Sequence, residues 1–184
     1  MPSLDEQTRG RLLRTARAAI EEALFGVRLN ESERPWPSME PRGAFVTLWR
    51  KESLRGCVGT FEPHGDLPAT IRSMAVAAAN DPRFACLPIS ENELKGIHIE
   101  ISVLSPLERI GDPLNFELGR HGIYVKRGGH AGCFLPDVAK EEGWDKETFL
   151  SQCCRHKAGM APAAWKQPGT EIFVFTVEKF SEVE

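Results

Sequence analysis

The chain has 184 residues and a formal net charge of −3 at pH 7, with 41% hydrophobic and 27% charged residues. These values are typical of a soluble globular protein that is long enough to bury a hydrophobic core. They argue against a general nucleic-acid or membrane-surface binder, and no apolar run approaches the roughly 20 residues needed to cross a bilayer.

The first 42 residues predict one helix and a loop that wraps over the surface. Ser3 and Glu6 form a capping box, and apolar residues then recur at helical spacing as far as Gly26. Three prolines between residues 30 and 42 indicate irregular structure, so we expect the next regular element after that point.

A strand, a turn and a second strand follow. Residues 43–49 are apolar and β-prone, residues 50–53 are polar, and residues 54–61 read Leu-Arg-Gly-Cys-Val-Gly-Thr-Phe. Alternate side chains of an extended segment share a face, so Arg55 and Cys57 are expected side by side. A guanidinium beside a thiol favours the thiolate, which is the nucleophilic form. The alternative is a small buried cysteine that packs within the strand.

The next segment predicts a helix and a third strand. Asp66 caps the helix, which ends near Asn80 because Asp81 precedes a proline and is kept out of helical geometry. Residues 97–104 then alternate strictly between apolar and polar types, with the isoleucines facing the core. The opposite face of this strand carries His98, Glu100 and Ser102.

The second half of the chain repeats this order of elements. The halves cover roughly residues 43–104 and 122–180, and each has a Gly-Cys pair in its second strand, at Cys57 and Cys133. The repeat predicts an α+β protein with two related strand–strand–helix–strand units around a mixed, partly barrel-like sheet. The alternative is a plain two-layer sandwich with coincidental similarity. A single compact unit predicts one shared core for these inward residues: Ile97, Ile99, Ile101 and Val103 with Ile172, Val174 and Thr176 or their neighbours.

Several short motifs occur in one order along the chain: Leu54-Arg-Gly-Cys-Val-Gly, Asp81-Pro-Arg-Phe, Val103-Leu-Ser-Pro, Leu135-Pro-Asp-Val-Ala and Lys157-Ala-Gly. Together they resemble the AMMECR-one family, whose bacterial and archaeal members are often labelled AmmeMemoRadiSam system protein A. The similarity begins near Gly43; Val58 replaces a more usual isoleucine, and Asp137 a more usual glutamine. It implies a single AMMECR-one-type domain over residues 1–184, built as two subdomains with a cleft.

The resemblance also implies partners. The family is associated with a Memo-like protein, related to class III extradiol dioxygenases, and with a radical S-adenosylmethionine protein. This association indicates a shared pathway of redox or modification chemistry on a small molecule or a macromolecule. The chain itself has no three-cysteine cluster motif and no glycine-rich phosphate loop, so we expect no bound cofactor.

Cysteine usage bears on compartment and on metal binding. Five cysteines without a framework of spacings, and an amino terminus without a secretion signal, predict a cytoplasmic protein with free thiols. His130 and Cys133 form one loose pair of possible ligands. A zinc site needs three or four protein ligands, so we expect no metal.

One functional hypothesis makes the cysteine segment an active site. Cys57 is then the nucleophile, and Arg55 supports its thiolate. His98, oriented by Glu100, is the candidate general base, and His64 is a second candidate. The residues expected to bind substrate around them are Gly56, Gly59, Arg83 and Glu100.

The other hypothesis is a non-catalytic binding or adaptor module that presents substrate to its partners. In that case Cys57 fills a groove and the flanking glycines allow close backbone contact. His98 then lies on a solvated strand face, and Arg83 forms an ion pair with Asp81. The sequence leaves open whether the protein is an enzyme.

Overall fold

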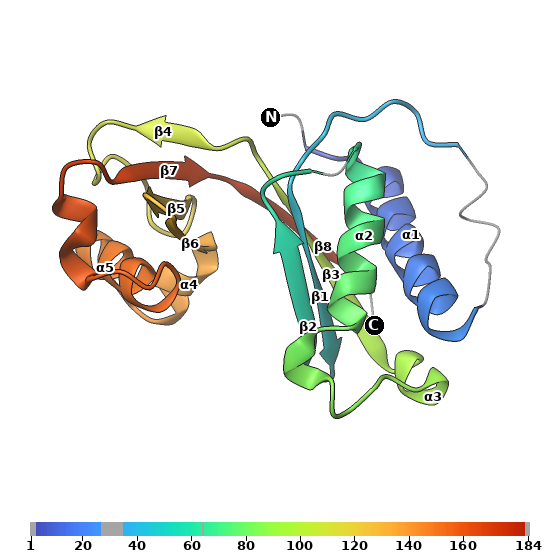
Figure 1. Ribbon diagram of the computed structural model, residues 1–184. Helices are drawn as coiled ribbons and strands as arrows, with labels where there is room; N and C mark the ends of the chain where they lie inside the picture. Colours follow the sequence, from blue (N-terminus) through green and yellow to red (C-terminus); the bar gives the residue numbers. More distant parts are fainter. Residues whose placement is uncertain (1–2, 27–34, 64, 183–184) are drawn as a thin grey trace. The chain divides into compact units, whose positions relative to one another are not determined.

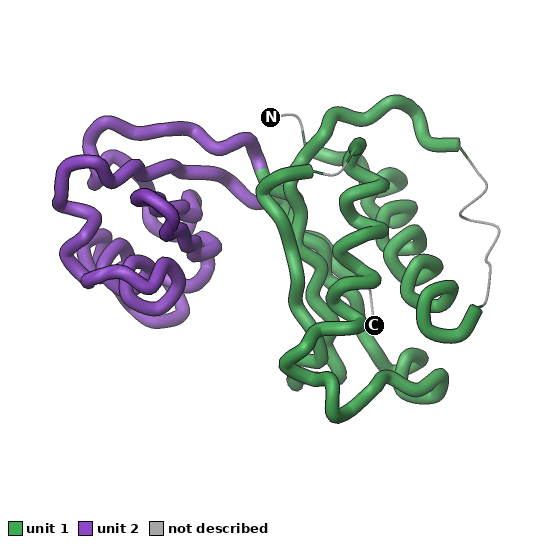
Figure 2. Tube along the Cα trace, viewed as in Figure 1, with its two compact units in different colours: residues 1–104, 178–184 green, residues 105–177 purple. Residues whose placement is uncertain are grey.

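The computed structural model describes residues 3–26, 35–63 and 65–182. The chain is an α+β protein that divides into two compact units, each with its own four-stranded sheet (Figure 2). Unit 1 comprises residues 1–104 and 178–184, and unit 2 comprises residues 105–177. The α+β class expected from the sequence is therefore confirmed.

Unit 1 packs two long helices, α1 (Glu6–Phe25) and α2 (Leu67–Ala79), on one face of its sheet (Figure 1). The sheet has the order β2-β1-β3-β8, with the strands β1 (Ala44–Arg50), β2 (Ser53–Thr60), β3 (Ile97–Leu104) and β8 (Val177–Ser181). A short helix, α3 (Glu91–Leu94), precedes β3. Within the described residues, no helix has the length and apolar character that crossing a membrane requires.

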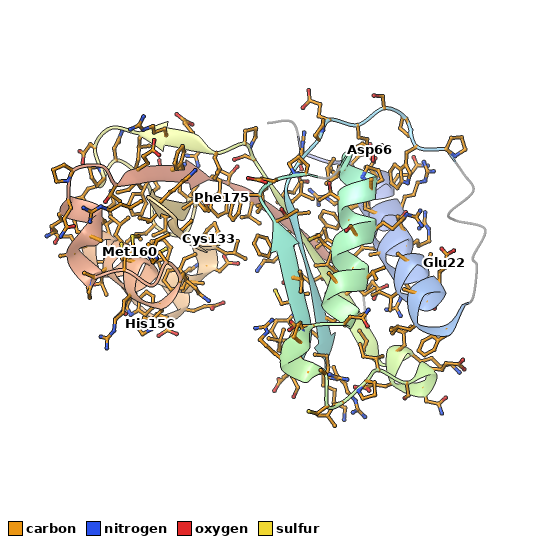
Figure 3. The ribbon with its side chains drawn as sticks, viewed as in Figure 1. Glu22, Asp66, Cys133, His156, Met160 and Phe175 are labelled. Carbon is orange, nitrogen blue, oxygen red and sulfur yellow. The ribbon has the colours of Figure 1, made fainter. Side chains whose placement is uncertain are left out.

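The caps of the two long helices lie close to where the sequence placed them. Asp66 caps α2 by accepting a hydrogen bond from the Ala69 amide (Figure 3), as predicted. The capping box predicted for α1 is wrong by two residues. The N-cap is Asp5, while the Ser3 hydroxyl donates to Glu178. Asp and Ser are equally good caps, so the capping pattern alone does not determine which of the two residues begins the helix.

Unit 2 is built on the sheet β4-β7-β5-β6. Its elements are β4 (Glu108–Ile110), β5 (Gly122–Arg127), β6 (His130–Phe134), α4 (Pro136–Glu141), α5 (Lys146–His156) and β7 (Glu171–Phe175). Ile172 and Val174 belong to the core of this unit, whereas Ile97 and Ile101 belong to the core of unit 1. The prediction of one shared core is thus wrong, because each sheet buries its apolar face against its own helices.

The two units nevertheless repeat one another as predicted, in the orders β1-β2-α2-β3 and β5-β6-α5-β7. A side chain at Gly56 would place its Cβ 2.0 Å from the Ala78 carbonyl oxygen, and one at Gly132 would lie 2.4 Å from the Ala158 nitrogen. In each unit, a glycine of the second strand lets that strand lie against the carboxyl end of the following helix.

Candidate functional site

The second strand of unit 1 contains a β-bulge at Arg55. Trp49 pairs with Leu54, but the next residue of β1, Leu48, pairs with Gly56, so Arg55 has no partner in β1. A bulge adds one residue to one strand and re-aims the side chains around it. The register of the rest of β2 is consequently shifted by one residue.

This shift brings Cys57 opposite Thr47. The Thr47 hydroxyl donates a hydrogen bond to the Cys57 sulfur, with Oγ1 and Sγ 3.3 Å apart. Thr47 also lies opposite Glu100 of β3, which forms an ion pair with Lys179 of β8 at 3.8 Å. Cys57, Thr47 and Glu100 form a row across the sheet, on the face opposite to the one that packs against α1 and α2.

Side chains hold both backbone polar groups of Cys57. Its N–H donates to Asp81 Oδ2 at 3.0 Å, and its carbonyl accepts a hydrogen bond from Arg83 Nη2 at 3.0 Å. In unit 1, β2 is the edge strand of the sheet, where such backbone groups have no neighbouring strand to pair with. The Asp81–Phe84 turn therefore takes the place of a further strand at this one residue.

Asp81 and Arg83 also bind one another, with Oδ2 and Nη2 2.6 Å apart. The hydrogen bond from Arg83 is the main reason why the pKa of Asp81 lies well below its ordinary value, and the Cys57 amide adds to the effect. The same pairing raises the pKa of Arg83. The Asp81 side chain is buried, but that of Arg83 is 58% exposed, so its guanidinium is accessible to a ligand.

Arg55 does not bind the thiol. Its Nε donates to Glu93 Oε1 at 2.6 Å, its Nη2 donates to the Leu87 carbonyl at 2.8 Å, and its guanidinium carbon lies 5.7 Å from the centre of the Phe84 ring. The hydrogen bond from Arg55 lowers the pKa of Glu93. The bulge thus directs Arg55 towards α3 and the segment after the Asp81–Phe84 turn.

The two glycines beside Cys57 are contacted by protein atoms. The space above Gly56 is occupied by the end of α2, and a Cβ at Gly59 would lie 2.2 Å from the ring of Phe45. Phe45 pairs with Gly59 across the sheet, so its ring covers the glycine. Both glycines are therefore required for packing, whatever else they do.

The structure places His98 apart from Cys57. His98 lies opposite Trp49, not in the row of Thr47 and Glu100, and two strand spacings separate β3 from β2, about 10 Å. His98 instead lines a pocket of unit 1 that also contains Lys51 and Lys95. His64 lies outside the described residues.

Unit 2 contains the pair of possible metal ligands that the sequence indicates. His130 is the first residue of β6, and Cys133, labelled in Figure 3, is the fourth of its five residues. Among the residues that the structure describes, no three His, Cys, Asp or Glu side chains gather as a metal site would require. None of the five cysteines, all of them within the described residues, forms a disulfide.

Sequence reasoning missed two contributors to the Cys57 site. The contact between Thr47 and Cys57 could not be predicted, because the bulge changes which residue of β2 lies opposite Thr47. Asp81 was considered only as an ion-pair partner of Arg83, although it also accepts the Cys57 amide. The proline after Asp81 was the available indication, since it fixes the turn in which an Asp side chain accepts nearby N–H groups.

Comparisons with known proteins identify the family of this α+β chain. The AMMECR1 family model matches residues 13–180, so the chain belongs to the AMMECR1 family. Over 94% of its length the chain is 42% identical to Protein MK0488 of Methanopyrus kandleri, of which 87% is covered. A protein of Thermococcus onnurineus is also 42% identical, over 93% of this chain and 88% of its own length.

A solved structure shows the same fold. The crystal structure of the uncharacterized protein PH0010 from Pyrococcus horikoshii has a TM-score of 0.79 to this chain at 37% identity. The match covers 93% of this chain and 89% of that one. The resemblance indicated by the motifs is thereby confirmed.

Proposed function

We propose that this protein acts through the Cys57 thiol, in a redox or modification pathway shared with a Memo-like protein and a radical S-adenosylmethionine protein. The partners come from the family resemblance. The observation that supports the thiol is its setting: Asp81 and Arg83 fix the Cys57 backbone, and Thr47 donates to the sulfur. A cysteine that only packs needs none of these three hydrogen bonds.

The chemistry proposed is nucleophilic. Cys57 loses its thiol proton to solvent water, and the Sγ thiolate then adds to an electrophilic carbonyl carbon of the substrate. The S–C bond forms as the C=O π bond breaks, and the carbonyl oxygen takes up a proton from water. A hydroxyl donor directed at the sulfur stabilises negative charge there, and Arg83 supplies a cation for an anionic group of the substrate. In this proposal Arg55 is a positioning residue, because it occupies the bulge that sets Cys57 opposite Thr47. Glu100 lies at the far end of the row formed by Cys57, Thr47 and Glu100.

A second candidate is the non-catalytic adaptor, which one observation favours. Leu87 is 68% exposed, more than any other large hydrophobic side chain of the described residues, and its carbonyl accepts the hydrogen bond from Arg55. In the adaptor, Leu87 is the apolar contact that the partner protein covers. In both candidates the protein works in the cytoplasm, where five free thiols are stable.

Intact-mass spectrometry during turnover tests the two candidates. The full-length protein is incubated with the Memo-like and radical proteins and with cell extract as the source of substrate. A nucleophilic Cys57 gives a mass adduct that is absent in Cys57→Ser and is reduced in Thr47→Val, which removes the donor at nearly constant volume. Cys86→Ser, at an exposed cysteine, is the matched control and keeps the adduct.

The outcomes separate clearly. An adduct that maps to Cys57 supports the enzyme. Full pathway activity in Cys57→Ser, combined with loss of activity in Leu87→Asp, supports the adaptor and rejects the thiol chemistry.

A further inference from the structure

A pocket of about 560 Å³ lies in unit 1 at the end of the sheet where β3 begins. Its volume is in the range of small-molecule sites. It is separate from the Cys57 site and is lined by Arg17, Lys51, Lys95, Gly96, Ile97, His98 and Glu182. Basic side chains from three separate segments meet here: the β1–β2 turn, the residue after α3 and the start of β3.

The one acidic residue of the lining is already neutralised. Arg17 Nε donates to Glu182 Oε1 at 2.7 Å, and Glu182 Oε2 accepts the Ile99 amide at 3.0 Å. Arg17 Nη2 and Nη1 donate to the carbonyls of Ile97 and Leu94. The Arg17–Glu182 pair is therefore a fixed part of the pocket wall, and the pair carries no net charge.

The remaining basic groups are not engaged. Within the described part of the chain, the side chains of Lys51, Lys95 and His98 make no ion pair or hydrogen bond. Both lysines are exposed, and His98 is partly buried. Two ammonium groups and one imidazole around an uncharged wall give the pocket a positive potential.

The backbone of Lys51 adds a second observation. Its φ is 54°, and among the described residues it is the one non-glycine residue with a positive φ. Glycine or asparagine would occupy this position of a two-residue hairpin turn without strain. Backbone strain of this kind concentrates at ligand sites, where the side chain has a use that outweighs the strain.

We propose that this pocket binds the phosphate group of a small anion. Lysine ammonium groups bind phosphate as point charges, and a phosphate offers two lysines more oxygens and more negative charge than a carboxylate does. The guanidinium of Arg17 is already occupied by Glu182 and the backbone. The imidazole of His98 provides a third donor and a flat surface for the rest of the ligand. The source of the phosphate is either free inorganic phosphate or a phosphorylated compound.

Isothermal titration of the full chain with inorganic phosphate, and with ribose 5-phosphate against ribose, tests this site. We expect saturable binding of one phosphate. Lys51→Asn and Lys95→Gln should each weaken it about five- to tenfold, as the loss of one charge-assisted contact predicts. Lys140→Gln, at an exposed lysine of α4, is the control and should bind as the wild type does. Tighter binding of ribose 5-phosphate than of inorganic phosphate identifies a phosphorylated compound as the source, and equal affinity identifies the free anion.

Thermal unfolding of the Lys51 variants shows whether weaker phosphate binding comes from a lost contact or from a destabilised fold. Lys51→Gly relieves the backbone strain, so it should raise the Tm while weakening phosphate binding. Lys51→Arg keeps the charge and should keep the affinity to within about twofold. Equal phosphate affinity in wild type, Lys51→Asn and Lys95→Gln overturns the proposal, as does the absence of saturable binding to the wild type.

Discussion

The backbone N–H of Cys57 donates a hydrogen bond to the Asp81 carboxylate at 3.0 Å. The two residues are 24 positions apart, and the whole of α2 lies between them. The carboxylate therefore joins the end of a helix to the edge of the sheet at Cys57. Stability and function are expected to depend on the same contact.

Replacing Asp81 by Asn should reduce the free energy of unfolding by about 1–3 kcal/mol at neutral pH, because a buried, charge-assisted set of hydrogen bonds is lost. Urea denaturation near neutral pH measures this difference. Glu40→Gln, at an exposed carboxylate, is the matched control and should change little.

The same variant should remove part of the pH dependence of stability. The pKa of Asp81 is lower in the folded protein than its ordinary value of 3.8, so the folded state binds fewer protons there. This contribution is complete above the unfolded pKa and is lost as the pH falls through the folded pKa. Wild type and Asp81→Asn should thus converge in stability as the pH is lowered below 3.8. A constant difference from neutral to acid pH would contradict this account.

Gly56→Ala should destabilise the protein by about 1–3 kcal/mol, because the new methyl group overlaps the Ala78 carbonyl and must displace the end of α2. Gly132→Ala should have a similar effect in unit 2. A Cβ at Gly111 meets nothing within 4 Å, so Gly111→Ala is the control. Urea midpoints compare the three variants, and equal midpoints for Gly56→Ala and Gly111→Ala would refute the packing argument.

Arg17→Met should lower the free energy of unfolding by about 2 kcal/mol, since it leaves the half-buried Glu182 without its cation and removes two bonds to backbone carbonyls. Arg109→Met is the control, because the ion pair of Arg109 with Glu171 is exposed and worth little. Thermal and urea unfolding provide the measurement. An equal loss of unfolding free energy in both variants would show that the Arg17 contacts stabilise the fold no more than an exposed ion pair does.

The class of the fold was predicted well from the sequence, because most helices and strands are indicated by patterns among residues close together in the chain. The alternation in residues 97–101 and the Asp66 cap depend on neighbours in the chain, and both are confirmed; from Ser102 to Leu104 every residue is buried. The division into two cores was not predictable in this way. An apolar strand face shows that a residue is buried, but it does not show which helix covers it.

The candidate site was predicted only in part, and Arg55 shows why. Strict alternation places Arg55 beside Cys57, but a bulge at Arg55 breaks the alternation at the critical residue. The guanidinium turns to Glu93, and the cation found at Cys57 is Arg83. A bulge depends on how two strands fit together, so a single strand sequence does not reveal it.

The rate of alkylation of each cysteine in the native protein tests the central claim most directly. Iodoacetamide at neutral pH, followed by peptide mass spectrometry, gives five rates from one sample. Cys57 should react about tenfold faster than Cys86, although Cys86 is the more exposed of the two, because Thr47 and the fixed backbone make its sulfur the better nucleophile. Cys153 and Cys154 are buried, and burial raises the pKa of both thiols, so they should react only after unfolding. If Cys57 reacts more slowly than Cys86, or as slowly as the buried pair, then its setting serves packing alone and the thiol is not the functional group.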